Sequence, residues 1–235
     1  MKTGFYAPIV RLLAALSLLT GASAALAQRA APPPAGCGEI NNLYGPFDYR
    51  TAHESRRALV ENAHFPRGVQ TLTKRATGEF GHDIGYTLAV FPNHHRAILV
   101  MERLSSLERS DPPRGADMTI DCYYARGMAY TPDDHVFRML YVSFLIRRDR
   151  LDEANKFLDY VVAQADDNPL TLFNAGMLFV DMKNYDKALI QAHKVMALGM
   201  TRPELRERLT AVGRWVEPDA KAGSAPDDAA SQPSR

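Results

Sequence analysis

The stretch RLDEANKFLDYVVAQADDNPLTLFNAGMLFVDMKNYDKA, residues 150–188, decides the fold. It opens on RLDEA and closes on NYDKA, two motifs whose matching residues lie 34 positions apart. Between the motifs, apolar side chains recur every three to four positions, as on a buried helix face, and the turn-forming sequence DDNP separates two such segments. The stretch therefore predicts a repeated unit of 34 residues that contains two helices.

The same period continues on both sides of this stretch. Pro203 follows Pro169 by 34 positions, whereas Pro92 and Pro132, which precede two earlier segments, are 40 positions apart. The six additional residues fit in the polar loop SDPPRG at 110–115. The other segments between residues 51 and 216 also show helical spacing, and none alternates like a strand for more than a few residues. The sequence therefore predicts an all-α fold.

A period of 34 residues with two helices resembles the tetratricopeptide repeat (TPR) family. Ala175 and Gly176, followed by Phe179, stand where that family has a leucine–glycine pair and a tyrosine, and Tyr185 and Ala188 fit the turn into its second helix. The resemblance implies a right-handed α-solenoid of stacked helical hairpins. The motifs GPFDYR, FPNHHRA and YYARGMAYTPDD also resemble those of exported, poorly characterised bacterial proteins of this type.

Composition and the repeats divide the chain into five segments. These are expected to be a signal peptide (1–27), a proline-rich extended leader and strap (28–50), divergent N-terminal helices (51–92), TPR-like repeats with a C-terminal capping helix (93–216) and a disordered tail (217–235). Small polar residues and prolines give the tail too little apolar surface to offset its ordering entropy. The end of the strap carries Tyr44, Phe47 and Tyr49, and it lies either over the first helices or along a wall of a binding site.

The N-terminus has the three parts of a secretory signal. Lys2 and Arg11 supply positive charge, LLAALSLLTG from Leu12 is an apolar core, and the small residues ASA at 22–24 or ALA at 25–27 suit cleavage. The apolar core is shorter than the roughly 20 residues of a membrane span. We therefore expect a periplasmic or secreted protein with no integral membrane segment after cleavage.

The charge balance excludes a nucleic-acid partner. Without the signal, 26 basic residues face 27 acidic ones, so the mature net charge is near −1. Proteins that bind nucleic acid carry a clustered positive excess. A protein or peptide ligand, in a scaffold that could belong to an envelope or secretion assembly, is the expected partner.

The chain has two cysteines, Cys37 and Cys122. An even count in an exported chain favours a disulfide because that compartment is oxidising. The bond would tie the leader to the middle of the chain and, with a loop this long, would stabilise the fold by roughly 4 kcal/mol.

The resemblance also implies a binding surface, because TPR proteins hold peptides on the concave face made by the first helix of each repeat. Methionine and phenylalanine supply adaptable apolar area there, and arginine can clamp a carboxylate. Position by position, the implied groove residues are Arg96, Leu99, Arg103, Met139, Ser143, Arg147, Phe173, Met177 and Asp181. The same side chains could instead pack against neighbouring helices.

The alternative function is metal binding or hydrolysis by the N-terminal histidines. The candidate ligands are His53, His64, His82, His94 and His95. His94 and His95 are adjacent, so on a helix they point about 100° apart, and no zinc-binding or serine-nucleophile motif occurs in the sequence. We therefore expect the pair to start a helix, and we expect no catalytic residue, no metal site and no cofactor.

Overall fold

The computed structural model describes residues 36–38 and 44–218. The expected signal peptide, most of the leader and nearly all of the tail lie outside these residues. Within the described residues the chain forms ten α-helices and no strand, which confirms the all-α prediction. The helices are α1 (Glu54–His64), α2 (Arg67–Gln70), α3 (Phe80–Val90), α4 (His95–Glu108), α5 (Ile120–Tyr130), α6 (His135–Arg147), α7 (Leu151–Gln164), α8 (Pro169–Asp181), α9 (Tyr185–Ala197) and α10 (Glu204–Ala211).

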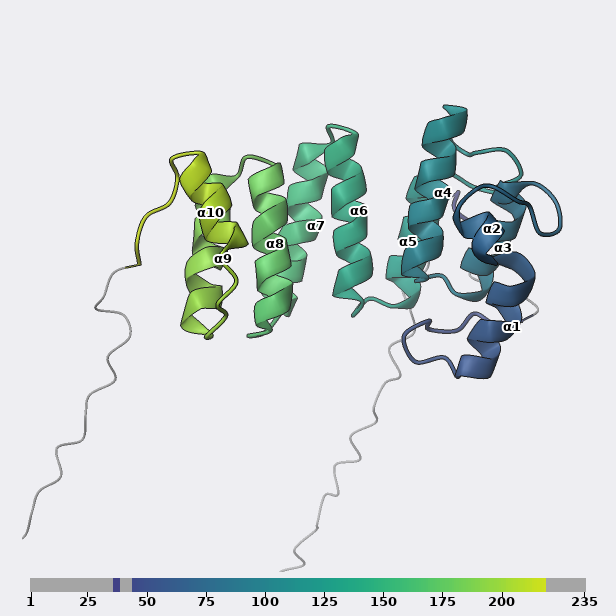
Figure 1. Ribbon diagram of the computed structural model, residues 1–235, viewed down its shortest axis with the longest axis horizontal. Helices are drawn as coiled ribbons and strands as arrows, with labels where there is room; N and C mark the ends of the chain where they lie inside the picture. Colours follow the sequence, from purple (N-terminus) through teal and green to yellow (C-terminus); the bar gives the residue numbers. More distant parts are fainter. Residues whose placement is uncertain (1–35, 39–43, 219–235) are drawn as a thin grey trace, which may run out of the picture.

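From α4 onward the helices lie side by side in a row (Figure 1). Each of α4, α6 and α8 packs against the helix that follows it in sequence, which forms the hairpins α4–α5, α6–α7 and α8–α9. The first helices also contact one another, α4 with α6 and α6 with α8, and α10 contacts both α8 and α9. Successive hairpins therefore occupy successive places in the row (Figure 1).

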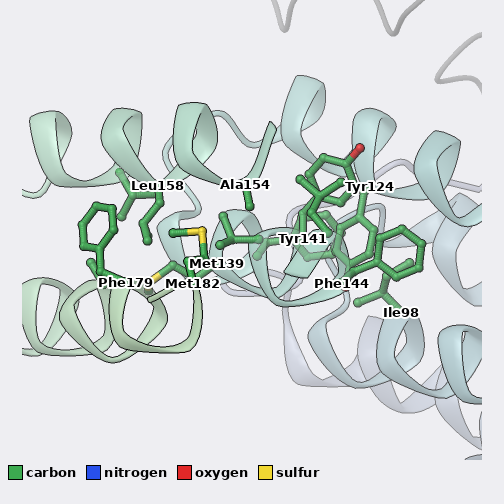
Figure 2. Packing of buried hydrophobic residues seen from close by; sticks show 14 of the residues in the cluster. Ile98, Tyr124, Met139, Tyr141, Phe144, Ala154, Leu158, Phe179 and Met182 are labelled. Atoms are coloured by element: carbon green, nitrogen blue, oxygen red, sulfur yellow. The ribbon is translucent and has the colours of Figure 1, made fainter. Parts of the chain in front are cut away.

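One hydrophobic core runs along this row. The rings of Tyr124 and Tyr141 have centroids 4.8 Å apart, and those of Tyr124 and Phe144 are 5.8 Å apart. Figure 2 shows these aromatic side chains grouped together, with Leu158 and Phe179 farther along the same cluster. Because one cluster connects successive hairpins, no hairpin buries its apolar side chains alone.

A second, smaller core holds the strap residues 44–50. Phe47 and Tyr49 pack against a cluster formed by Val60, Val90 and Phe91. The backbone N–H of Phe47 donates to the carbonyl of Val90 at 2.8 Å. The described part of the strap therefore packs against the N-terminal helices, and its residues Phe47 and Asp48 also line a hollow of about 690 Å³ beside Tyr130.

Cys37 and Cys122 form the predicted disulfide. The bond joins positions 85 residues apart and ties the segment before the strap to α5. Within residues 36–38 and 44–218, no helix has the length and apolar character needed to cross a membrane.

The second helix is much shorter than its sequence suggests. The restart at Pro66 and the glycine at Gly78 predict a helix over 66–78, but α2 ends at Gln70. Leu72 adopts a left-handed φ of 59°, which ends the helix. The prediction was wrong because the following loop folds back onto the buried carboxylate of Asp83, which accepts hydrogen bonds from the N–H groups of residues 76 and 77.

Two helix starts also differ from expectation. Thr51 and Glu54 have the spacing of a capping box, yet the N-cap of α1 is His53, whose side chain accepts from the Ser55 N–H. The expected N-cap of α4 is Asn93, yet His94 takes that place. Asn93 is instead used in contacts between helices, described below.

Candidate functional site

The structure gathers some of the expected groove residues around a hollow between α6 and α8. Met139, Ser143 and Met177 line it, and its volume is about 270 Å³. The remaining lining residues are Val136, Leu140, Asn174 and Leu178. The hollow is therefore mostly apolar, with one hydroxyl and one amide as its polar groups.

Two of the expected groove residues belong to the core. Met139 is 6 % exposed and Phe173 is 5 % exposed, so each presents only an edge to solvent. Sequence periodicity places both on the correct helices, but it does not separate a residue at the base of a hollow from one on its rim.

Three polar groove residues already have partners on neighbouring helices. The Arg96 guanidinium donates to Gln70, and Asp181 forms an ion pair with Arg208 at 2.7 Å. Arg147 pairs with Glu102, which is buried in α4 and also accepts a hydrogen bond from Tyr124. These contacts show that the charged side chains expected in the groove also join neighbouring helices.

Glu102 explains why Arg147 has this position. Burial raises the pKa of Glu102, while the hydrogen bond from Tyr124 and the charge of Arg147 act in the opposite direction. A buried carboxylate requires a partner of opposite charge or hydrogen bonds to stay ionised. Arg147 is thus first a partner of Glu102, although its side chain remains 53 % exposed.

Leu99 and Arg103 extend the apolar and basic surface along α4. Leu99 is 41 % exposed, and Arg103 is exposed with no ion pair among the described residues. At the 40-residue offset Leu99 and Arg103 correspond to Met139 and Ser143, so the repeat gives them the α4 positions equivalent to two lining residues of the hollow.

Sequence reasoning missed the most exposed apolar residues of this surface. Val136 and Leu170 are each 50 % exposed and lie at the starts of α6 and α8. The signal for both was present, because 34 positions separate them, as 34 positions separate Leu140 from Asn174. Applying the repeat offset to every residue of a first helix would have found them.

The adjacent histidines start α4, as predicted. His94 is fully buried, its Nδ1 accepts from the Ala97 N–H at 3.2 Å, and its Nε2 donates to Glu61 at 3.1 Å. Tyr49 stacks on the His94 ring at 4.0 Å and donates through its hydroxyl to the same carboxylate. Both ring nitrogens of His94 are thus occupied, so this histidine has no nitrogen left for a metal or a substrate.

Burial decides the charge of His94. Burial lowers the pKa of its imidazole more than the Glu61 carboxylate raises it, so the ring is neutral near neutral pH. In return, the hydrogen bond from His94 lowers the pKa of Glu61 below its ordinary range. The pair is a neutral histidine that donates to an ionised carboxylate.

Asn93 and His95 join the strap to α6. The buried amide of Asn93 donates to Asp48 at 2.7 Å and to Asp134 at 2.9 Å, and its oxygen accepts from the Tyr49 N–H. His95 donates to Asp134 at 2.9 Å, and Asp134 in turn caps α6. The FPNHHRA motif therefore connects four parts of the chain, and its polar side chains have structural partners.

The other histidines of the alternative function lie apart from this cluster. His53 caps α1, His64 lies 3.4 Å from Asp83, and His82 is exposed on α3. Among the residues that the structure describes, no group of three or more histidine, cysteine, aspartate or glutamate side chains could hold a metal ion.

Comparison with models of protein families, with curated proteins and with solved structures found no match.

Proposed function

We propose that this chain is an exported scaffold of the tetratricopeptide repeat type. In this proposal the row of hairpins is a right-handed α-solenoid, and the surface made by its first helices binds a protein or peptide partner without turnover. The scaffold would act in the periplasm or outside the cell, as part of an envelope or secretion assembly.

The arrangement of helices supports the solenoid. Each first helix contacts its own second helix and the first helix of the next unit, which is the contact pattern expected of stacked helical repeats. Such stacks present one continuous surface of first helices, and the contacts of α6 with α4 and with α8 support the proposal that these three helices form it.

The hollow between α6 and α8 is the observation that carries the binding proposal. Its lining is mostly apolar and contains two methionines and the half-exposed Val136, and Leu170, which lies one repeat after Val136, is equally exposed at the start of α8. Methionine adapts its shape to varied partners, and contiguous exposed apolar surface marks interaction sites in soluble proteins. Arg103 adds a positive charge at the α4 side, which favours a partner segment with apolar and acidic residues.

Two observations support export. The first 27 residues have the charge and hydropathy pattern of a secretory signal, and Cys37 forms a disulfide with Cys122. Disulfides persist chiefly in oxidising compartments such as the periplasm.

Site-specific crosslinking in intact cells tests the proposal. A photoreactive amino acid at Val136 or Leu170 should give a discrete adduct with one partner. The same amino acid at Ile190, which is 61 % exposed on α9 and lines no part of the hollow, should not. Identical adducts from both surfaces would contradict the assignment of the groove.

The captured partner must then bind in purified form. Val136→Asp, Arg103→Glu and Met177→Ala should each weaken its affinity by about ten-fold, as expected for loss of a central apolar contact or reversal of a complementary charge. Ile190→Asp is the matched control, and circular dichroism verifies that helicity is retained. Wild-type affinity in all three groove variants would place the partner elsewhere.

A further inference from the structure

A separate hollow lies at the C-terminal end of the row, between the end of α9 and the start of α10. Its volume is about 340 Å³, within the range of small-molecule pockets. It shares no residue with the hollow between α6 and α8. Its lining residues are Ala192, Val195, Met196, Gly199, Met200, Thr201, Arg202, Pro203, Leu205 and Arg206.

The walls of this hollow are mostly apolar, and its polar side chains are two arginines and Thr201. Val195 and Leu205 are buried core residues, while Met196 keeps 38 % of its surface exposed. Arg202 and Arg206 are the charged residues of the lining, and no acidic residue belongs to it. An apolar site with a few convergent polar groups is the usual composition of a ligand pocket.

The two arginines are available to different degrees. The Arg202 guanidinium lies 5.5 Å from the ring centroid of Phe173 and has no ion pair among the described residues. Arg206 lies 5.1 Å from the ring centroid of Trp215 and pairs with Glu217 on the chain that follows α10. A carboxylate can therefore bind Arg202 directly and compete with Glu217 for Arg206.

From this geometry we propose that the hollow between α9 and α10 binds an alkyl carboxylate, such as a medium-chain fatty acid. The alkyl chain lies against the methionines and Val195, and the carboxylate binds Arg202 and Arg206. Guanidinium groups suit this role because their parallel N–H groups match the two oxygens of a carboxylate. The site is formed by one turn of α9, a short loop and the first turn of α10, which is too small to seat a helix of about 10 Å diameter.

Trp215 is the only tryptophan of the chain, and its ring contacts the guanidinium of Arg206, so a ligand that binds Arg206 should change its fluorescence. Decanoate, below its micelle concentration, is titrated into the full-length mature protein and followed by tryptophan emission and by calorimetry. We expect saturable binding of one decanoate per chain. Decyltrimethylammonium, which has the same chain and the opposite charge, should not bind.

Substitution of the charged residues at and near the hollow should change the affinity for decanoate in a specific pattern. Arg202→Gln or Arg206→Gln should weaken decanoate about three- to five-fold each, the usual effect of losing an exposed charge pair. Glu217→Gln should strengthen binding because it frees Arg206. Arg208→Gln, on the same helix but outside the hollow, should leave the affinity unchanged.

Several results would overturn the site. The site is wrong if decanoate gives no saturable heat or change in tryptophan emission, or if decyltrimethylammonium binds as well as decanoate. It is also wrong if the Arg208 and Arg202 variants lose the same affinity for decanoate. Association of the ligand-free chain that the Arg202 variant abolishes would indicate that a second copy fills the hollow. None of these results depends on the groove between α6 and α8, so this proposal and the proposed scaffold function can fail separately.

Discussion

Asn93 joins the strap to α6 through several hydrogen bonds of one side chain. Its side chain is fully buried and contacts Asp48, Asp134 and the Tyr49 N–H. Each of these groups would lose a hydrogen bond in a low-dielectric environment if the amide were removed.

Asn93→Ala should therefore lower the free energy of unfolding by about 2–4 kcal/mol, because two carboxylates and one backbone N–H would lose a partner. Urea denaturation measures this change. Asn62→Ala, at an exposed position of α1, is the control and should alter stability by less than about 1 kcal/mol. A loss in Asn93→Ala no larger than in the control would show that water replaces the amide.

The pH dependence of stability should follow from His94. Burial holds the folded-state pKa of His94 below its ordinary value of 6.5, so the unfolded chain binds the proton more readily. The contribution of neutral His94 to the free energy of unfolding is therefore fully present above about pH 6.5, and it is lost progressively as the pH falls below that value. The lowered pKa values of Glu61 and Asp134 add a further loss at more acidic pH, below the ordinary values of 4.5 and 3.8.

Replacement of His94 by a residue that cannot titrate should separate these two losses. His94→Asn keeps a side chain that can cap α4 and removes the ionisable ring. Its urea midpoint should change little between pH 7 and pH 5, whereas the wild-type midpoint should fall. His82→Asn, at an exposed position of α3, should follow the wild type. A variant with the wild-type pH profile would assign the titration to other groups.

For single residues, the sequence indicated where a helix starts, but it did not indicate which distant side chains would form hydrogen bonds. The stretch from Pro92 to His95 indicated a helix start, and α4 does begin at His95, although His94 and not the expected Asn93 is its N-cap. The partners of His94 lie at positions 49 and 61, and nothing in the local sequence connects these positions. Contacts between distant segments depend on how the helices stack, which local patterns do not encode.

Gly127 of α5 and Gly81 of α3 lie where neighbouring backbone and side-chain atoms leave no room for a Cβ. A Cβ on Gly127 of α5 would lie 2.5 Å from the Pro92 carbonyl oxygen and 2.3 Å from the Phe137 ring. A Cβ on Gly81 of α3 would lie 2.4 Å from the Arg114 carbonyl oxygen. Backbone and a packed ring cannot move aside easily, so these glycines set the distances of α5 and α3 from their neighbours.

Gly127→Ala and Gly81→Ala should each destabilise the fold by about 1–3 kcal/mol, the usual cost of overpacking. Gly78→Ala is the control, because no atom lies within 4 Å of its Cβ position. It should be neutral or slightly stabilising, since alanine restricts the unfolded chain. Thermal unfolding followed by circular dichroism distinguishes the variants. Equal midpoints in all three would mean that the helices shift apart at little cost.

The boundaries of long periodic helices were predictable, and those of the divergent N-terminal part were not. The RLDEA and NYDKA motifs begin α7 and α9 at Leu151 and Tyr185, as the repeat predicts. The predicted helix over 66–78 failed because Asp83 offers the loop backbone an alternative set of hydrogen bonds. Helical propensity is a weak preference, and a buried carboxylate that satisfies several N–H groups overrides it.

The disulfide acts on the whole molecule because it closes a long loop. Cys37→Ser/Cys122→Ser should lower the free energy of unfolding by roughly 4 kcal/mol, since the unfolded chain regains the entropy of 85 residues. The urea midpoint of the double variant measures this loss, and wild-type protein reduced with dithiothreitol should match it. An unchanged midpoint would show that the segment before the strap contributes nothing to the folded state.

The proposed solenoid makes a stronger prediction about how local damage spreads. In a stack of repeats, stability is the sum of each unit and its interfaces with adjacent units, so a defect at one end should not reach the other. Leu209 is fully buried in α10, and Leu209→Ala removes apolar contacts with α8 and α9 at a cost of about 2–5 kcal/mol. Under native conditions, hydrogen exchange should accelerate in α9 and α10 and stay at wild-type rates in α1, α3 and α4.

Val60→Ala, at the opposite end, is the matched variant and should accelerate exchange in α1 and α3 while α9 stays protected. If either substitution accelerates exchange equally in all helices, the chain unfolds as one cooperative unit, and the additive stack on which the proposed groove rests is wrong.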